Sequence, residues 1–146
     1  MDIAQPNIAE LAGGAEAFQT LVDDFYRRVE ADPPLRAVYP ADLEPGKTHL
    51  GLFLAQYFGA GNIYSEHRGH PRLRMRHAGL RVTFDGAVRW ARHMSAAVRA
   101  QDWPDEAQQA VLGYIDDAVP MMINTHESTG RQELPTVIVG PGQAAI

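Results

Sequence analysis

The stretch that decides the fold of this chain reads EHRGHPRLRMRHA and runs from Glu66 to Ala78. After its opening glutamate it carries four arginines and three histidines, with no further acidic residue. A run of like charges usually covers a solvated helix face. Here Leu73 and Met75 interrupt the run, and it ends in His77 beside a small residue. We therefore expect part of this stretch to turn inward.

On both sides of this stretch, apolar residues recur at steps of three and four, which is typical of amphipathic helices. The repeats cover residues 18–29, 50–58, 87–98 and 111–123, and a shorter helix is expected to begin at Pro71. Asp85 is expected to cap the helix that extends to Arg99. The pattern predicts an all-α domain over residues 1–127, followed by a flexible tail at 128–146 that is rich in Gly, Pro, Ser and Thr.

Composition limits the classes of protein to consider. The chain has 146 residues, of which 45% are hydrophobic and 21% charged, as expected for one globular domain. It has no cysteine, which excludes disulfides and thiolate metal sites, so a bound metal would use His, carboxylate or Tyr ligands. Its formal net charge of -5 argues against bulk attraction to nucleic acid. Without an apolar run of about 18 residues or a signal peptide, we expect a cytoplasmic protein with no membrane span.

Three aromatic residues with a polar atom stand out near the apolar stripes. They are Tyr26, Tyr39 and Trp90. Taken one at a time, each is best explained as core filling whose hydroxyl or indole N–H reaches a carbonyl. Taken together with His77, they are also compatible with a buried ligand site.

Residues Tyr64 to Ala78 resemble the signature of group II truncated haemoglobins. Other segments match in order and spacing, over residues 9 to 125: Gly13-Gly14, Phe25-Tyr26, Val38-Tyr39-Pro40, Phe53-Leu54, Gln56-Tyr57, Trp90 and His93-Met94. The resemblance implies a shortened globin, a two-over-two α-helical sandwich around haem b.

The same resemblance assigns His77 as the single protein ligand of the iron. One neutral imidazole leaves the opposite face of the iron free for a diatomic ligand. The resemblance puts Tyr26, Tyr39 and Trp90 on that distal face, where O–H and N–H groups can donate to the outer oxygen of dioxygen. His93 is expected at an exposed or rim position. The remaining cofactor-binding residues that the resemblance implies are Gly46, His49, Leu50, Phe53, Tyr57, Tyr64, His70, Arg74, Met75 and Arg76.

Several of these residues have specific expected tasks. Leu50 is an apolar wall, and Gly46 stands where many globins place a distal histidine. The haem propionates need cations or hydroxyl donors, for which the candidates are Arg76, Arg74, His70, His49, Tyr57 and Tyr64. The chain departs from the family pattern at Phe58, where a tryptophan is usual, at Gly79-Leu80, where Pro-Phe is usual, and at His49, where a long cation is usual.

A pocket with three donors implies tight binding and slow release of dioxygen. The leading hypothesis is a haem protein with redox chemistry, either nitric oxide detoxification or peroxidase-like turnover. An unidentified reductase would supply the electrons. The expected ligands are dioxygen, nitric oxide, carbon monoxide and peroxide, and a second copy of the chain is a candidate partner. The alternative is a sensor or scavenger that is not an enzyme and acts through a partner. A third hypothesis is a helical domain without haem, whose basic run binds an organic anion or RNA.

Overall fold

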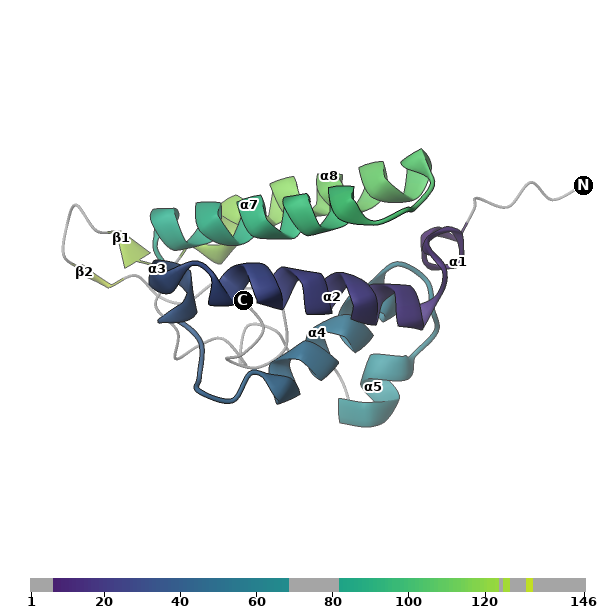
Figure 1. Cartoon of the computed structure of the whole chain (residues 1–146), viewed down its shortest axis with the longest axis horizontal. Coiled ribbons are helices and arrows are strands. Elements are labelled where there is room, and N and C mark those ends of the chain that lie inside the picture. Colours follow the sequence, from purple (N-terminus) through teal and green to yellow (C-terminus); the bar gives the residue numbers. More distant parts are fainter. Residues whose placement is uncertain (1–6, 69–81, 124, 127–130, 133–146) are drawn as a thin grey trace, which may run out of the picture.

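The computed structural model describes residues 7–68, 82–123, 125–126 and 131–132. The helices are α1 (Ile8–Ala12), α2 (Ala15–Glu30), α3 (Pro33–Arg36), α4 (Glu44–Tyr57), α5 (Ile63–Arg68), α7 (Phe84–Ala100) and α8 (Asp105–Met122) (Figure 1). Beyond α8, the two-residue strands β1 (Thr125–His126) and β2 (Arg131–Gln132) pair antiparallel. The helices carry the fold, which confirms the predicted all-α architecture.

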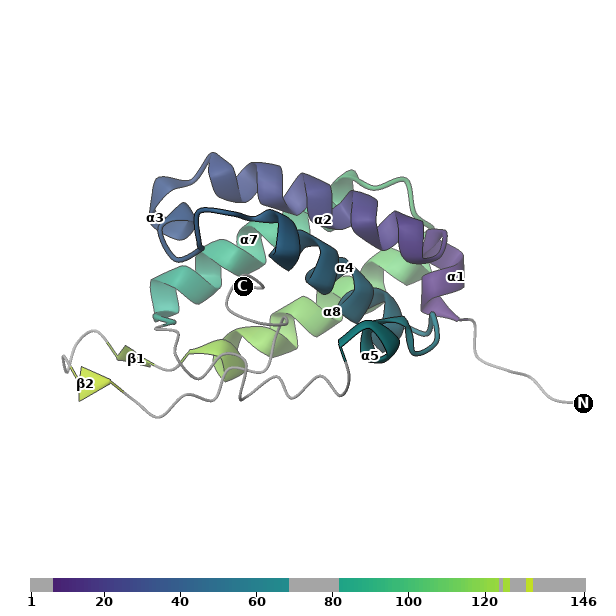
Figure 2. The ribbon, with the colours of Figure 1, turned by 90° about the horizontal axis from the view of Figure 1, so that it is seen from below.

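The long helices form two layers. In Figure 1, α7 and α8 lie side by side above α2 and α4, and α5 lies beside the end of α4. Figure 2, seen from below, shows α2 and α4 in front of the α7–α8 pair. The most extensive contacts join α2 to α4, α7 to α8, and α2 to α7. This arrangement is the expected two-over-two sandwich. Helix α2 contacts α4 in its own layer and α7 in the other layer.

Helix α2 occupies the centre because its apolar stripe is continuous. Two glycines with positive φ, Gly13 at 119° and Gly14 at 84°, separate α1 from α2 and let the chain turn sharply. The buried residues of α2 are Phe18, Leu21, Val22, Phe25, Tyr26 and Val29. They include every member of the predicted stripe. Burial of this face against both layers stabilises the domain through the removal of apolar surface from water.

Helix α4 approaches α2 closely where it has a glycine. A Cβ atom on Gly51 would overlap the amide of Gln19 on α2. The Gln19 amide donates a hydrogen bond of 3.2 Å to the Thr48 carbonyl of α4. Gly51 therefore leaves room for a side chain that joins the two helices.

The start of α7 differs from the prediction. Thr83, not Asp85, is the N-cap: its hydroxyl accepts a hydrogen bond of 3.0 Å from the Gly86 amide. Asp85 lies in the first turn and accepts a bond of 2.8 Å from Arg89 Nε. The capping prediction was wrong because Thr83 has the extended backbone of a cap, with φ -87° and ψ 169°, and so starts the helix at Phe84.

Candidate functional site

Four aromatic side chains from three segments meet between the helical layers. The Tyr26 ring on α2 contacts the Tyr39 ring edge-on, with 5.6 Å between the centroids. Phe25 lies 5.3 Å from Tyr26 and 6.2 Å from Trp90 on α7, again edge-on. All four residues are at least 94% buried. The structure thus brings together the three aromatic residues selected from the sequence, with Phe25 joining them.

Arg36 fixes the loop that carries Tyr39. Its guanidinium donates three hydrogen bonds to consecutive carbonyls, those of Tyr39 at 3.3 Å, Pro40 at 3.0 Å and Ala41 at 3.0 Å. A planar guanidinium with several donors suits this fork of acceptors. Since these bonds hold the backbone on both sides of Pro40, the Tyr39 ring enters the aromatic cluster from a rigid loop.

Two polar atoms in this cluster are buried without a partner. Within the part of the chain that the structure describes, neither the Tyr39 hydroxyl nor the Trp90 Nε1 has a hydrogen-bond partner. An unpaired buried donor costs about 1–3 kcal/mol, so such atoms are rare unless a ligand or water completes them. Both atoms are therefore available to a ligand that enters the cluster.

The phenols of the cluster are held in the neutral form. Burial raises the pKa of Tyr26 well above its ordinary value. Burial also raises the pKa of Tyr39, and the neighbouring Tyr26 raises it further. A neutral phenol keeps its proton, so both hydroxyls can donate hydrogen bonds at any pH near neutrality.

Helix α4 supplies the residues predicted to line the cofactor. Gly46, Leu50 and Phe53 are buried, and His49 between them is half-buried. Tyr57, one turn beyond Phe53, is 56% exposed, and the two rings lie 6.2 Å apart. The predicted residues of α4 therefore run from the buried interior to the surface.

Tyr64 on α5 is buried against this helix. Its ring meets Phe53 edge-on, with a centroid distance of 5.6 Å. The Gln56 side chain holds the two helices together, because its amide donates to Ser65 Oγ at 3.0 Å and its carbonyl accepts from the Ser65 amide at 3.0 Å. The two hydrogen bonds to Ser65 therefore fix the position of the neighbouring Tyr64.

A pocket of about 710 Å³ opens between α4 and α8. Its walls include Phe53 and Tyr57 from α4 and Tyr114, Ala118 and Met121 from α8. Its volume lies within the range of small-molecule and cofactor sites. The sequence prediction missed the α8 side of this pocket, because its walls come from two helices that are far apart in the chain.

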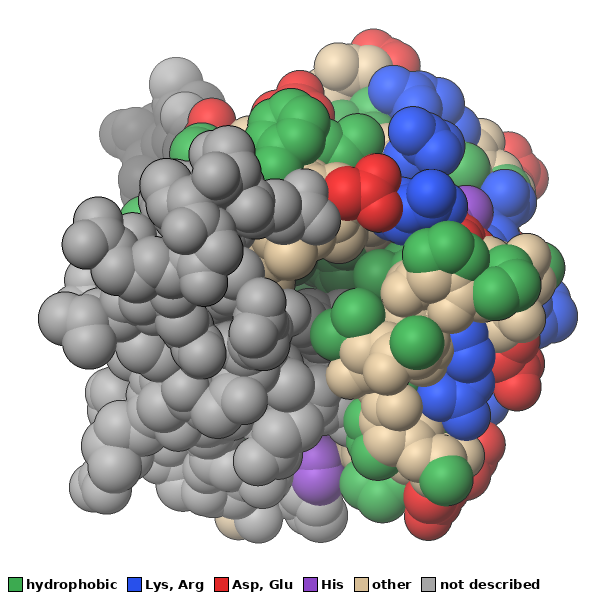
Figure 3. All heavy atoms as spheres, turned by 90° about the vertical axis from the view of Figure 1, so that its left-hand side faces the viewer, with side chains coloured by type: hydrophobic (Ala, Val, Ile, Leu, Met, Phe, Trp, Pro, Cys, Tyr) green, Lys and Arg blue, Asp and Glu red, His purple; other side chains and the backbone are tan. Residues whose placement is uncertain are grey.

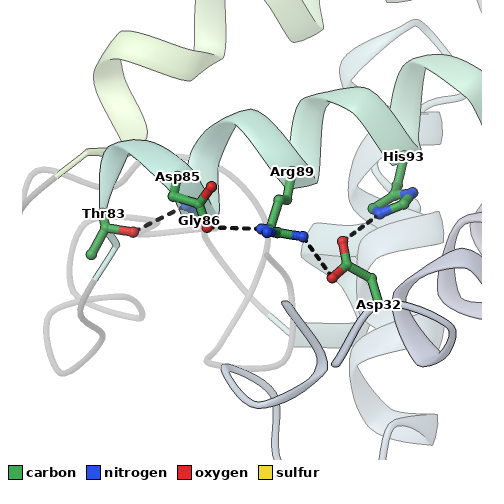
Figure 4. Close-up of polar contacts among 6 residues, drawn as sticks. All are labelled: Asp32, Thr83, Asp85, Gly86, Arg89 and His93. Atoms are coloured by element: carbon green, nitrogen blue, oxygen red, sulfur yellow. Dashed lines mark hydrogen bonds and ion pairs between the residues drawn. The ribbon is translucent and has the colours of Figure 1, made fainter. Parts of the chain in front are cut away.

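An ion-pair network with a buried carboxylate at its centre involves the turn of α7 that carries Trp90. Asp32, only 8% exposed, accepts from Arg89 Nη1 at 2.9 Å and from His93 Nε2 at 2.7 Å (Figure 4). His93 lies at the rim as expected, but nothing in the sequence pattern predicted its contact with Asp32. The hydrogen bond from His93 lowers the pKa of Asp32, burial opposes this, and the hydrogen bond and charge of Arg89 lower it again.

Five predicted site residues lie outside the described residues. They are His70, Arg74, Met75, Arg76 and the expected iron ligand, His77.

The end of the molecule near α3 and the start of α7 carries basic and acidic side chains side by side (Figure 3). Within the described ranges, no helix combines the length and apolar character needed to cross a membrane.

The helical sandwich is that of a globin, and comparison with known proteins agrees. The chain belongs to the bacterial-like globin family, whose profile matches residues 7–129. It is 33% identical over 118 residues to the group 2 truncated hemoglobin YjbI of Bacillus subtilis, covering 81% of this chain and 89% of that protein. Within the family it is a group II truncated haemoglobin.

Two solved structures have the same fold. The hemoglobin of Chloroflexus aurantiacus is 49% identical, with a TM-score of 0.78, over 82% of this chain and 99% of that one. The truncated oxygen-avid haemoglobin of Bacillus subtilis is 32% identical, with a TM-score of 0.75, over 82% of this chain and all of that one (100%). The family binds oxygen, and its cofactor is haem b.

The described residues fit this cofactor. Haem with a diatomic ligand needs an apolar, water-excluding pocket with a few donors aimed at the ligand. The cluster offers two buried donors without a partner, on Tyr39 and Trp90, in otherwise aromatic surroundings. If these two side chains served packing alone, both donors would stay without a hydrogen-bond partner among the described residues.

Proposed function

We propose that this truncated haemoglobin binds dioxygen tightly and uses it in redox chemistry, with Tyr26, Tyr39 and Trp90 as the donors on the distal side. The observation that carries the proposal is the pair of buried donors, Tyr39 Oη and Trp90 Nε1, that have no partner among the described residues. A ligand with a partly negative outer atom would satisfy both.

The haem iron supplies reversible binding of dioxygen with electron density drawn toward the outer oxygen. The residues of the cluster act on that oxygen. Each hydrogen bond from a neutral phenol or indole contributes about 0.5–1.5 kcal/mol net, which slows ligand release about threefold to tenfold. The low dielectric of the aromatic surroundings strengthens each bond. Several such donors together make release slow, which suits chemistry on the bound ligand better than transport.

His77 is the proposed protein ligand of the iron, and Gly46 leaves the distal entrance without a histidine gate. Leu50, Phe53 and Met75 are the proposed apolar walls. The rise in exposure along α4, from buried Phe53 to exposed Tyr57, is compatible with a haem whose propionates point toward the surface. The proposed propionate partners are His49, Tyr57, Tyr64, His70, Arg74 and Arg76.

The proposed reaction is nitric oxide dioxygenation or peroxide turnover. Two oxidisable rings, Tyr26 and Tyr39, lie 5.6 Å apart in the cluster, and Phe25 lies between Tyr26 and a third, Trp90. Similarity to the oxygen-avid protein of Bacillus subtilis supports slow release. Either reaction needs an electron donor, which we propose to be a separate reductase.

The test measures consumption of nitric oxide by the oxygenated protein with a reductase and a reduced nicotinamide cofactor present. Sustained turnover is expected, and a Trp90→Phe variant should release dioxygen faster during the cycle. Trp103→Phe is the matched control, because Trp103 is also buried but packs on Phe18 at 5.2 Å, away from the cluster. A single stoichiometric reaction without turnover would instead favour a sensor or scavenger.

A further inference from the structure

The ion-pair network of Asp32 joins the two parts of the proposed distal pocket. Asp32 is the residue before α3, whereas Arg89 and His93 lie one turn apart on α7 (Figure 4). Trp90 lies between these two partners in the sequence, on the buried side of the same turn. The carboxylate therefore holds the turn of α7 that carries the indole.

The same aspartate is close in sequence to both tyrosines of the cluster. Tyr26 lies six residues before Asp32 and Tyr39 seven residues after it. The intervening backbone is rigid, because α2 continues to Glu30 and Arg36 binds the carbonyls of the Tyr39 loop. A contact at Asp32 thus sets the position of α7 relative to the segment that carries Tyr26 and Tyr39.

Both oxygens of the Asp32 carboxylate take part in this contact with α7. The two bonds, 2.9 Å from Arg89 and 2.7 Å from His93, reach the two different oxygens of one carboxylate. Both distances lie in the short range that is typical of hydrogen bonds with a charged partner. Because both oxygens of the carboxylate are bound by residues one turn apart on α7, the pair of bonds favours one register of α7 relative to Asp32.

Asp85 adds a further constraint to the same network. Arg89 donates from Nε to Asp85 at 2.8 Å while its Nη1 binds Asp32. The guanidinium is thus held between two carboxylates, one on its own helix and one on the other layer. Among the described residues, this network is the connection by charged side chains between α7 and the start of α3.

We propose that Asp32 is a positioning residue of the distal pocket: without touching the ligand, it fixes the Trp90 indole in the aromatic cluster beside Phe25 and thereby slows dioxygen release. This inference rests on the proposed function of Trp90 as a donor. Asp32→Asn keeps the shape of the side chain but removes its charge and one of its two acceptor oxygens. The expected result is a displaced indole and faster release.

The matched control is Asp24→Asn. Asp24 also lies on the α2 side, is 14% exposed in its side chain, and accepts from Arg28 at 3.2 Å. Its contact with α7 is at the far end, through Gln101 at 3.5 Å. Both variants remove one partly buried carboxylate, but only Asp32 contacts the turn that carries Trp90.

The experiment uses the haem-loaded full chain. The indole N–H signals of Trp90 and Trp103 are followed by NMR in the diamagnetic carbon monoxide form, and dioxygen release is timed by stopped flow. Asp32→Asn should move the Trp90 signal, leave Trp103 in place, and speed release about threefold or more. Asp24→Asn should leave both readouts at wild-type values, and Asp32→Glu should restore part of the wild-type rate.

Two outcomes overturn the proposal in different ways. If Trp90→Phe speeds release while Asp32→Asn behaves like Asp24→Asn, Asp32 has no positioning role and the proposed function stands. If Trp90→Phe leaves release unchanged, the donor role fails and the positioning role fails with it. Should Asp32→Asn not take up haem, Arg89→Met provides the same measurement from the other side of the contact, with the same expected acceleration.

Discussion

Removal of the Tyr39 hydroxyl should change stability and ligand binding in opposite directions. In the ligand-free protein this buried group has no partner among the described residues, so it costs about 1–3 kcal/mol of folding free energy. Tyr39→Phe should recover part of that cost, because the ring keeps its edge-on contact with Tyr26 at 5.6 Å. With dioxygen bound, the variant loses a donor worth about 0.5–1.5 kcal/mol and should release the ligand about threefold to tenfold faster.

Two measurements check this pair of effects. Urea unfolding of the ligand-free protein, followed by far-UV circular dichroism, gives the change in the free energy of unfolding. Stopped-flow displacement of dioxygen by carbon monoxide gives the release rate. Trp103→Phe is the control for release, because Trp103 is also buried but packs on Phe18 at 5.2 Å, outside the cluster. The reasoning is refuted if Tyr39→Phe destabilises the ligand-free protein by more than about 1 kcal/mol, the net worth of a satisfied bond, with release unchanged.

Three further predictions concern the iron ligand, the distal side and acid stability. His77→Ala should abolish the Soret band while far-UV circular dichroism still reports a helical fold, and unchanged haem absorbance would exclude His77 as the ligand. Trp90→Phe should speed dioxygen dissociation in stopped flow more than His93→Ala does, and equal, negligible effects would remove Trp90 from the distal side. The lowered pKa of Asp32 should contribute stability that is present above the ordinary aspartate range and is lost as the pH falls through the folded-state pKa. Urea unfolding of wild type and Asp32→Asn should thus converge in acid, and a gap that stays constant from neutral pH to about pH 3 would contradict this assignment.

Much of the fold could be predicted from local sequence alone. The three- and four-residue spacing of Phe18, Leu21 and Phe25 requires a helix with one buried face, and the structure buries all three. Glycines and prolines also marked where helices begin and end. The helix start at Thr83 was missed because threonine and aspartate are both good caps, and only the backbone around Thr83 chooses between them.

The candidate site was only partly predictable. Tyr26, Tyr39 and Trp90 could be selected from the resemblance, since each keeps its place in the order of motifs. The lack of a partner for the Tyr39 hydroxyl and the Trp90 Nε1 among the described residues could not be predicted, because it depends on every neighbour of these atoms in three dimensions. The pocket between α4 and α8 was missed for the same reason, as its walls belong to two helices far apart in the chain.

The chain itself therefore determined its helices, through periodicity, and its membership in the globin family, through the basic stretch that ends at His77. Tertiary structure decided which polar groups meet. In the sequence, Asp32 followed by two prolines indicates only the end of a helix. In the structure, its carboxylate binds Arg89 and His93, which are 57 and 61 residues further along the chain. Such a contact depends on how α2, α3 and α7 cross, and the crossing follows from the packing of whole helix faces rather than from any local pattern.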